Sequence, residues 1–192
     1  MQVYLALVTS DWKSILIAQK RIVNDLWGGK KAQAPSLVNQ AGQFCLPGGG
    51  LEKGLTPEQG AVLEFLEETG VDLNAVLSPR GTKVKEFAKG YFCCVFVMLS
   101  VNEMQVVFQA ARNNIAQGQV KDGELERVIL AGFPVARFLG NRVALPVEYD
   151  KAIQSAKKYS QDVDWYALIA KDLDQVALAM QKQNQLLAAA KK

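Results

Sequence analysis

The sequence contains no histidine among its 192 residues. This absence excludes a histidine-based catalytic triad, a zinc site with histidine ligands and an imidazole general base. Any acid–base or metal chemistry must therefore use carboxylates, with lysine, tyrosine or cysteine as the remaining alternatives.

Cysteine is also scarce, being limited to Cys45, Cys93 and Cys94. Their number is odd, two are adjacent and their neighbours are apolar, which argues against a framework of disulfide bonds. We expect all three to pack as small apolar side chains in a protein of a reducing compartment.

The chain also lacks long apolar runs and dense basic tracts. No segment reaches the roughly 18 apolar residues of a membrane-spanning helix, and residues 1–14 are typical of a strand, not of a signal peptide. The net charge is only +3, so we expect neither a membrane nor a nucleic-acid partner. Because hydrophobic residues make up 49% of the chain, we expect a globular, cytoplasmic protein with a substantial core.

The hydrophobic pattern predicts mixed strands around one marked helix, followed by a helical tail. Residues 3–10 and 14–22 indicate a β-hairpin, and 24–43, rich in Gly, Asn, Gln and Lys, indicate a long loop. The other expected elements are a helix at 57–69, a buried strand at 91–101, a segment at 104–119 that fits strand or helix, and a strand at 124–133.

The chain changes character after Pro146, where the sequence becomes helical. In this tail, apolar residues recur every three or four positions, which predicts one apolar stripe that packs on this domain or on a second copy. The stripe consists of Trp165, Leu168, Ile169, Leu173, Val176 and Met180. We therefore predict an α+β fold with a domain at 1–146, a C-terminal helical extension at 147–192, and a homodimer as one alternative.

The helix at 57–69 carries an unusual cluster of charge. Thr56, Pro57 and Gln59 form a capping-box start, and Gly70 is placed to end the helix. At 100° per residue, its glutamates Glu64, Glu67 and Glu68 share an arc of roughly 100°, opposite the apolar face.

No lysine or arginine stands among these glutamates, and like charges three and four residues apart repel one another. A solvated acidic face is the ordinary explanation for such a pattern. A bound divalent cation is the alternative, because Mg²⁺ takes carboxylate and phosphate oxygens.

The surrounding segment, "LPGGGLEKGLTPEQGAVLEFLEETGV" (46–71), resembles the Nudix box, Gly-x5-Glu-x7-Arg-Glu-U-x-Glu-Glu-x-Gly-U, where U is a bulky aliphatic residue. Aligned without gaps, Gly49 takes the first position, and Gly70 and Val71 close the motif. Glu64, Glu67 and Glu68 match its metal-binding glutamates. The resemblance implies an α/β/α sandwich with a mixed sheet.

Two positions depart from the family pattern. Leu55 stands where the family has Glu, and Leu63 where it has Arg, an electrostatic partner of the glutamates. Phe65 is a milder change, an aromatic at an aliphatic position. All three metal-binding glutamates of the pattern are therefore present, whereas the arginine that supports them in the family is replaced.

The resemblance implies a hydrolase that cleaves the pyrophosphate bond of a nucleoside diphosphate linked to another moiety. Glu64, Glu67 and Glu68 would bind Mg²⁺ or Mn²⁺, and the general base would be Glu68 or Glu64. Such sites often add a carboxylate from another loop, for which Asp122, Glu124 and Glu126 are the candidates and Glu124 is our choice as a metal ligand.

The substrate, a small-molecule nucleotide, would meet further residues. Gly48 and Gly49 allow close approach of the backbone, Lys20 and Arg21 could contact phosphate, and Trp27 could stack on a base better than Tyr91 or Phe92. The alternative, favoured by Leu55 and Leu63, is a degenerate Nudix module that binds a nucleotide or a partner without turnover.

Overall fold

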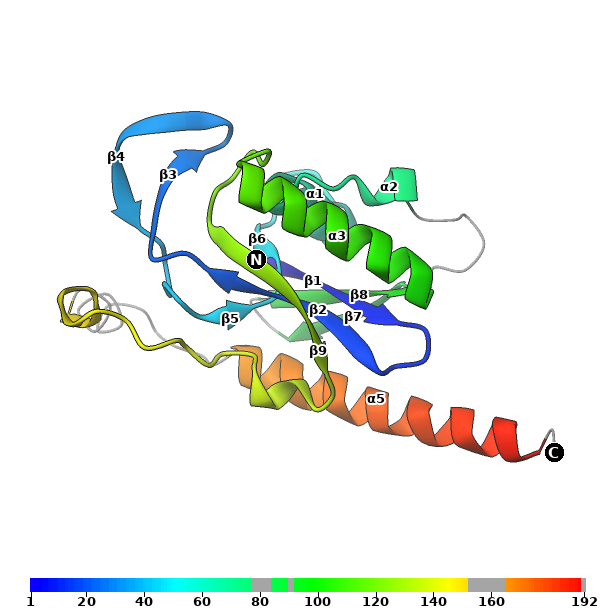
Figure 1. The fold of residues 1–192 in the computed structure, drawn as a ribbon. Helices are drawn as coiled ribbons and strands as arrows, with labels where there is room; N and C mark the ends of the chain where they lie inside the picture. Colours follow the sequence, from blue (N-terminus) through cyan, green and yellow to red (C-terminus); the bar gives the residue numbers. More distant parts are fainter. Residues whose placement is uncertain (77–83, 90–91, 152–164, 191–192) are drawn as a thin grey trace.

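The computed structural model describes residues 1–76, 84–89, 92–151 and 165–190, and its elements are shown in Figure 1. The strands are β1 (Gln2–Thr9), β2 (Ser14–Lys20), β3 (Val23–Trp27), β4 (Lys30–Leu37), β5 (Phe44–Cys45), β6 (Gly48–Gly50), β7 (Val84–Lys89), β8 (Phe92–Leu99) and β9 (Leu125–Gly132). The helices are α1 (Pro57–Thr69), α2 (Leu73–Val76), α3 (Val101–Gln117), the 3₁₀ turn η1 (Val135–Arg137) and α5 (Trp165–Ala189).

The main sheet is mixed. Strands β1 and β2 form the expected antiparallel hairpin, β1 runs parallel to β8, and β2 pairs antiparallel with β9. Its path is β5-β2-β1-β8-β7, with β6 paired to β1 and β9 paired to β2. This sheet with helices on both faces is the predicted α+β sandwich.

The sheet splits between its two central strands. Strands β1 and β2 pair only near their connection, where Leu7 faces Leu16 and Val8 faces Ile15. Beyond that point β6 pairs with β1 and β5 pairs with β2, so the chain from 44 to 50 lies where the strands separate. The glycine run is therefore held inside the sheet.

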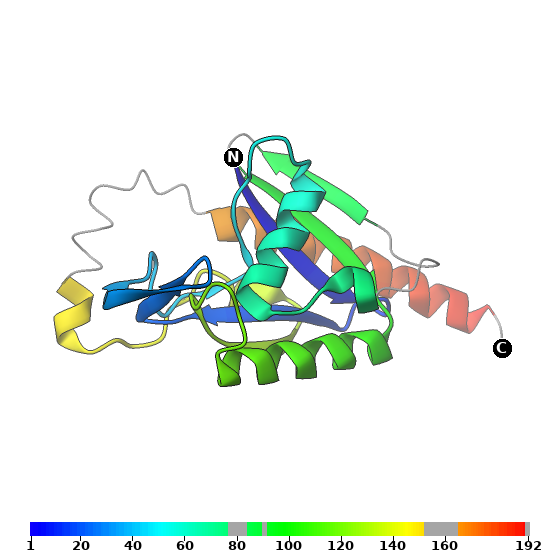
Figure 2. The ribbon, with the colours of Figure 1, turned by 90° about the horizontal axis from the view of Figure 1, so that it is seen from above.

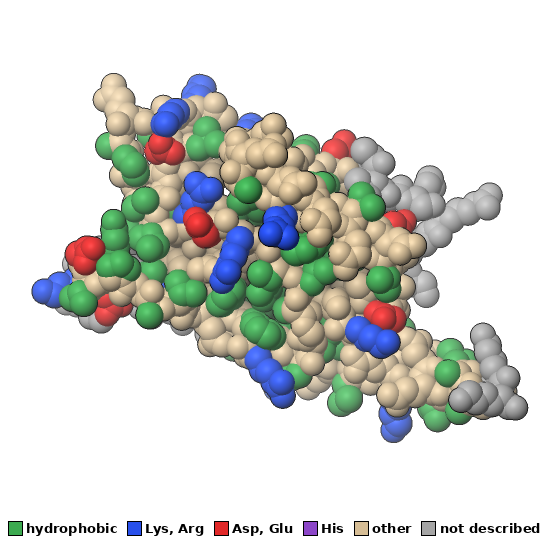
Figure 3. Space-filling model, in the orientation of Figure 1, with side chains coloured by type: hydrophobic (Ala, Val, Ile, Leu, Met, Phe, Trp, Pro, Cys, Tyr) green, Lys and Arg blue, Asp and Glu red, His purple; other side chains and the backbone are tan. Residues whose placement is uncertain are grey.

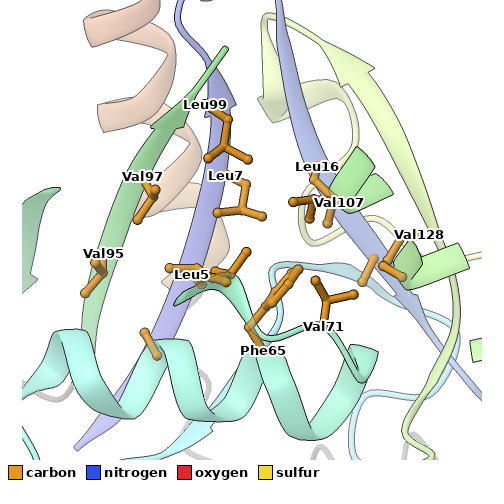
Figure 4. Close-up of a cluster of buried hydrophobic side chains, with 14 of the residues drawn as sticks. Leu5, Leu7, Leu16, Phe65, Val71, Val95, Val97, Leu99, Val107 and Val128 are labelled. Carbon is orange, nitrogen blue, oxygen red and sulfur yellow. The ribbon is translucent and has the colours of Figure 1, made fainter. Parts of the chain in front are cut away.

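Alternate side chains of the central strands point to opposite faces, as the pleat of a strand requires. One face packs under α1 and α3, and Figure 4 shows Phe65 of α1 beside Leu5 of β1, with Val95 and Val97 of β8 farther along the same cluster. The opposite face, with Tyr4, Ala6, Phe92, Cys94 and Phe96 among its buried side chains, packs against α5. Both faces of the sheet are buried. This explains why β8, the strand predicted at 91–101, is almost wholly apolar.

Helix α5 covers this second face, and Figures 1 and 2 show it crossing the sheet on the side away from α1 and α3. Ile169 and Leu173 are buried as predicted, but Leu168 is 36% exposed. The helix instead buries Ala170 and Ala177, whose small side chains allow close approach to the sheet. The predicted stripe thus packs on this domain, whereas the boundary at 146 stays a prediction.

The expected long loop at 24–43 is wrong. Most of it forms β3 and β4, a separate two-stranded antiparallel sheet in which Asn24 faces Ser36 and Trp27 faces Lys30. All eight residues of β4 are exposed, so the sequence carries no alternation of apolar and polar residues to indicate a strand.

Most of the ambiguous segment at 104–119 lies in a helix, α3, which ends at Gln117. The side chain of Ser100 accepts a hydrogen bond from the Glu103 N–H, and the Glu103 side chain accepts one from the Ser100 N–H. The buried residues follow at helical spacing: Met104, Val107, Ala111 and Ile115. This capping box lies directly before the ambiguous segment and explains why the segment is a helix and not a strand.

None of the helices in the described part of the chain is long and apolar enough to span a membrane. On the face shown in Figure 3, lysine and arginine side chains are scattered among apolar and acidic ones.

We predict that Leu173→Ala destabilises the protein by about 2–5 kcal/mol, because Leu173 is fully buried between α5 and the sheet. The matched control is Leu178→Ala on the same helix, where the leucine is 71% exposed, and its effect should stay within about 0.5 kcal/mol. Urea unfolding measures both. Equal effects would show that α5 is not packed on the sheet in solution.

We predict a second contrast within the glycine run. A Cβ at Gly48 would lie 2.2 Å from the carbonyl oxygen of Val3 and 2.8 Å from the Cα of Tyr4, so Gly48→Ala should cost about 1–3 kcal/mol or more. A Cβ at Gly50 meets nothing within 4 Å, and Gly50→Ala should be nearly neutral. The free energy of unfolding of the two variants tests this, and a neutral Gly48→Ala would contradict the packing of β6 against β1.

Candidate active site

Helix α1 is fixed at both ends by its own sequence. The Thr56 hydroxyl accepts a bond from the Gln59 N–H at 3.2 Å, and the Gln59 side chain accepts one from the Thr56 N–H at 3.0 Å. At the other end, Gly70 adopts a left-handed conformation with φ of 68° and donates its N–H to the Leu66 carbonyl oxygen. With its ends fixed and Phe65 buried against the sheet, the helix presents Glu68 to Gly48 at the split.

Glu68 reaches deepest into this split. Its side chain is buried, and its Oε2 accepts a hydrogen bond of 2.8 Å from the Gly48 N–H. Burial raises the pKa of Glu68 well above its ordinary value; Lys20 and the bond from Gly48 act in the opposite direction. The carboxylate and the glycine strand hold each other in place.

Glu64 lies under the next glycine. A Cβ at Gly49 would approach the Glu64 Oε2 to 2.5 Å, so the close contact between this strand and the carboxylate needs glycine. Burial, followed by the charges of Glu67, Asp122 and Glu124, raises the pKa of Glu64 to about 7. These carboxyl groups thus act on one another electrostatically although they come from two segments of the chain.

Glu67 lies at the outer side of the cluster and is bound to the loop before β9. Its carboxylate Oε1 accepts a hydrogen bond from the Lys121 ammonium group. Its main-chain carbonyl oxygen accepts the N–H groups of Lys121 and Asp122, both at 2.9 Å. One residue of α1 therefore anchors the loop by its side chain and by its backbone.

Two of the three acidic candidates from this loop join the cluster. Asp122 accepts hydrogen bonds from the Asn24 amide at 3.3 Å and the Glu124 N–H at 3.1 Å. Burial and then Glu124 raise the pKa of Asp122 to about 6. The third candidate, Glu126, is 58% exposed and pairs with Arg21 at 3.4 Å.

Glu124 contacts Lys20 at 2.9 Å, and both side chains are largely shielded from solvent. Burial alone would lower the pKa of Lys20, but Cys45, Glu124 and Glu68 outweigh it and the pKa is raised. Lys20 is therefore a charged group inside the acidic cluster.

Within the described part of the chain, the glutamates consequently have two cationic partners, Lys20 and Lys121, both from outside α1. The sequence of the helix shows no cation among its glutamates, and position 63 holds a partly exposed leucine. Lys121 is the residue that sequence reasoning missed. Its only signal is its place directly before Asp122 in the acidic segment already singled out.

The remaining predicted substrate contacts come from different segments of the chain. Arg21 donates its Nε–H to the Leu125 carbonyl oxygen at 2.9 Å, and Trp27 lies partly buried at the end of β3. Phe92 is buried on the opposite face beside Trp165, with ring centroids 5.7 Å apart, whereas Tyr91 lies outside the described residues. The three cysteines are free and buried, as expected.

The donor chemistry of the cluster suits a hard divalent cation, because Glu64, Glu67, Glu68 and Glu124 supply carboxylate oxygens. Within the described ranges, however, no three acidic or cysteine side chains converge closely enough to hold a metal ion. Lys121 and Lys20 bind two of the four carboxylates. A metal would need these side chains to turn toward a common point.

Similar solved structures include a mutT/nudix family protein from Listeria innocua, with 16% identity, 82% of this chain and 93% of that chain covered, and a TM-score of 0.43. The E. coli dihydroneopterin triphosphate pyrophosphohydrolase shows 14% identity, covers 82% of this chain and 92% of its own, and has a TM-score of 0.40. No curated protein gives a significant match.

The family itself is decided by the sequence match to the NUDIX domain, which extends over residues 5–154 and so over most of the chain. It includes the glycine strand, α1 and the loop with Asp122 and Glu124. The chain belongs to the Nudix family.

Proposed function

We propose that the protein is a metal-dependent hydrolase that cleaves the pyrophosphate bond of a nucleoside diphosphate linked to another moiety. Nudix hydrolases generally hydrolyse nucleoside diphosphate derivatives. The observation that carries the proposal here is the cluster of carboxyl groups from α1 and the loop at 118–124, placed beside the split in the sheet.

We assign Glu64, Glu67, Glu68 and Glu124 to the binding of Mg²⁺ or Mn²⁺. Such a cation would neutralise pyrophosphate charge and lower the pKa of a bound water. The support for this assignment is electrostatic: burial and mutual repulsion raise the pKa values of Glu64 and Glu68, and a cation would relieve both effects. Of the two candidates for the general base, Glu64 is the more accessible, whereas Glu68 is buried against Gly48.

Other residues would position the substrate. Gly48 donates its N–H to Glu68 and Gly49 leaves room for the Glu64 carboxylate, so we assign the backbone of this strand, next to both glutamates, to the contact with a diphosphate. Lys20 lies within the cluster and would contact phosphate, with Arg21 next to it on the chain. Trp27, carried by the β3–β4 hairpin, is our choice for stacking on a base.

A non-catalytic Nudix module is the second candidate. Specific contacts favour it: Glu67 and Glu124 are each paired with a lysine, and leucine occupies positions 55 and 63. Such a module would bind a nucleotide or a partner without turnover. A panel of nucleoside diphosphate derivatives, incubated with Mg²⁺ or Mn²⁺ and assayed for phosphate-containing products, separates the two functions.

We predict that Glu68→Gln lowers turnover about a hundredfold or more, because a neutral amide replaces a charged ligand in a preorganised site. The control is Glu58→Gln, the same substitution at an exposed position in the first turn of α1, which should leave turnover unchanged. Both variants should bind substrate and unfold cooperatively. Wild-type turnover in Glu68→Gln would exclude the proposed site.

We also predict that Mn²⁺ stabilises the fold. A ligand that binds only the native state adds about 2.7 kcal/mol at a concentration one hundred times its Kd. Thermal unfolding with millimolar Mn²⁺ and with a chelator measures the effect. The double variant Glu64→Gln/Glu68→Gln should lose it, and an equal shift in that variant would place the metal elsewhere.

A further inference from the structure

Lys121 contacts the proposed active site in a way that the glutamates on α1 alone do not predict. Its ammonium group donates a hydrogen bond to Glu67, and the bond to Glu67 is the largest cause that raises the pKa of Lys121. Glu52 and Glu64 act on it in the same direction. Lys121 thus lies in the field of several carboxylates and not of one partner.

The same lysine lies in a loop tied to α1 through the backbone. The Lys121 and Asp122 N–H groups both bind the Glu67 carbonyl oxygen, while the Lys121 carbonyl oxygen accepts the Gly29 N–H at 2.6 Å. The loop is therefore held between α1 and the tip of the β3–β4 hairpin. A second bond joins them, from the Gly123 N–H to the Leu26 carbonyl oxygen at 3.0 Å.

The loop carries two acidic residues of the cluster, Asp122 and Glu124, directly after Lys121. A shift of the loop relative to α1 would move these groups away from Glu64 and Glu68. The Lys121–Glu67 contact therefore has a double consequence, because it fixes the Glu67 carboxylate and keeps the two acidic segments together.

The helix itself provides no substitute for this contact. The residue four positions before Glu67, where a cation would face it along the helix, is Leu63. We propose that Lys121 is a positioning residue that supplies this missing cation from the loop, orients Glu67 and joins the loop carboxylates to those of α1. The proposal rests on the proposed function only for its effect on metal binding and turnover.

The test compares Lys121→Met, which keeps the alkyl chain but removes the charge, with Lys121→Arg, which keeps the charge. The control is Lys13→Met, which removes an exposed lysine from a pair with Asp11 at the β1–β2 turn. Direct Mn²⁺ binding should weaken roughly tenfold or more in Lys121→Met, the range found when groups supporting metal ligands are removed. It should be retained in Lys121→Arg and Lys13→Met.

Adding Leu63→Arg to Lys121→Met should return Mn²⁺ affinity toward the wild-type value, because an arginine four residues before Glu67 replaces the lost cation. Tighter Mn²⁺ binding in Lys121→Met would overturn the proposal, since it would make Lys121 a competitor of the metal. Unchanged binding would overturn it as well.

Amide hydrogen exchange in the presence of chelator tests the second consequence without metal or turnover. The amides of Lys121 and Asp122 should exchange severalfold faster in Lys121→Met than in the wild type or in Lys13→Met, because their bonds to Glu67 open more often. Faster exchange in a protein that hydrolyses nothing would reject the proposed function and support the positioning role. Equal exchange would reject the positioning role whatever the activity.

Discussion

The hydrogen bond from the Gly48 N–H to the Glu68 carboxylate joins the two parts on which the site depends. It places a carboxylate of α1 in the split between β1 and β2, where burial raises its pKa. The split is a consequence of strand pairing. Where β1 and β2 do not pair with each other, β6 pairs with β1 and β5 pairs with β2. Each part supports the other: without Glu68 the Gly48 N–H loses its acceptor, and a Cβ at Gly49 would collide with the Glu64 carboxylate of the same helix.

The repulsion among the carboxyl groups around this bond is reduced by cations that come from elsewhere in the chain. Lys20 ends β2 and reaches Glu124, while Lys121 precedes β9 and reaches Glu67. An exposed ion pair contributes little by itself, but a cation among several carboxylates acts on all of them. The cluster therefore depends on strands and loops beyond the helix that carries its glutamates.

Local signals made α1 and its glutamates predictable, since Thr56, Gln59 and Gly70 lie beside the helix they delimit. The partners of these glutamates were not predictable in the same way. Lys121 and Glu67 are 54 residues apart, and only the path of the sheet brings them together. Strand β4 was missed for another reason: its residues are all exposed, so pairing with β3 and not burial defines it. In contrast, the nearly continuous apolar runs of β1 and β8 follow directly from two covered faces.

The two candidate functions differ in what they require of the ion pairs between these lysines and Glu67 and Glu124. A hydrolase needs Glu67 and Glu124 to share a cation with Glu64 and Glu68, so each of the two carboxylates would offer the cation its second oxygen while the first stays bound to a lysine. A binding module can keep both ion pairs and use the lysines for phosphate. Glu67 is the informative residue, because its carboxylate binds the Lys121 side chain while its backbone carbonyl oxygen binds the N–H groups of Lys121 and Asp122. These contacts orient the carboxylate and keep the two acidic segments together, which the proposed metal-dependent hydrolysis would require of this chain.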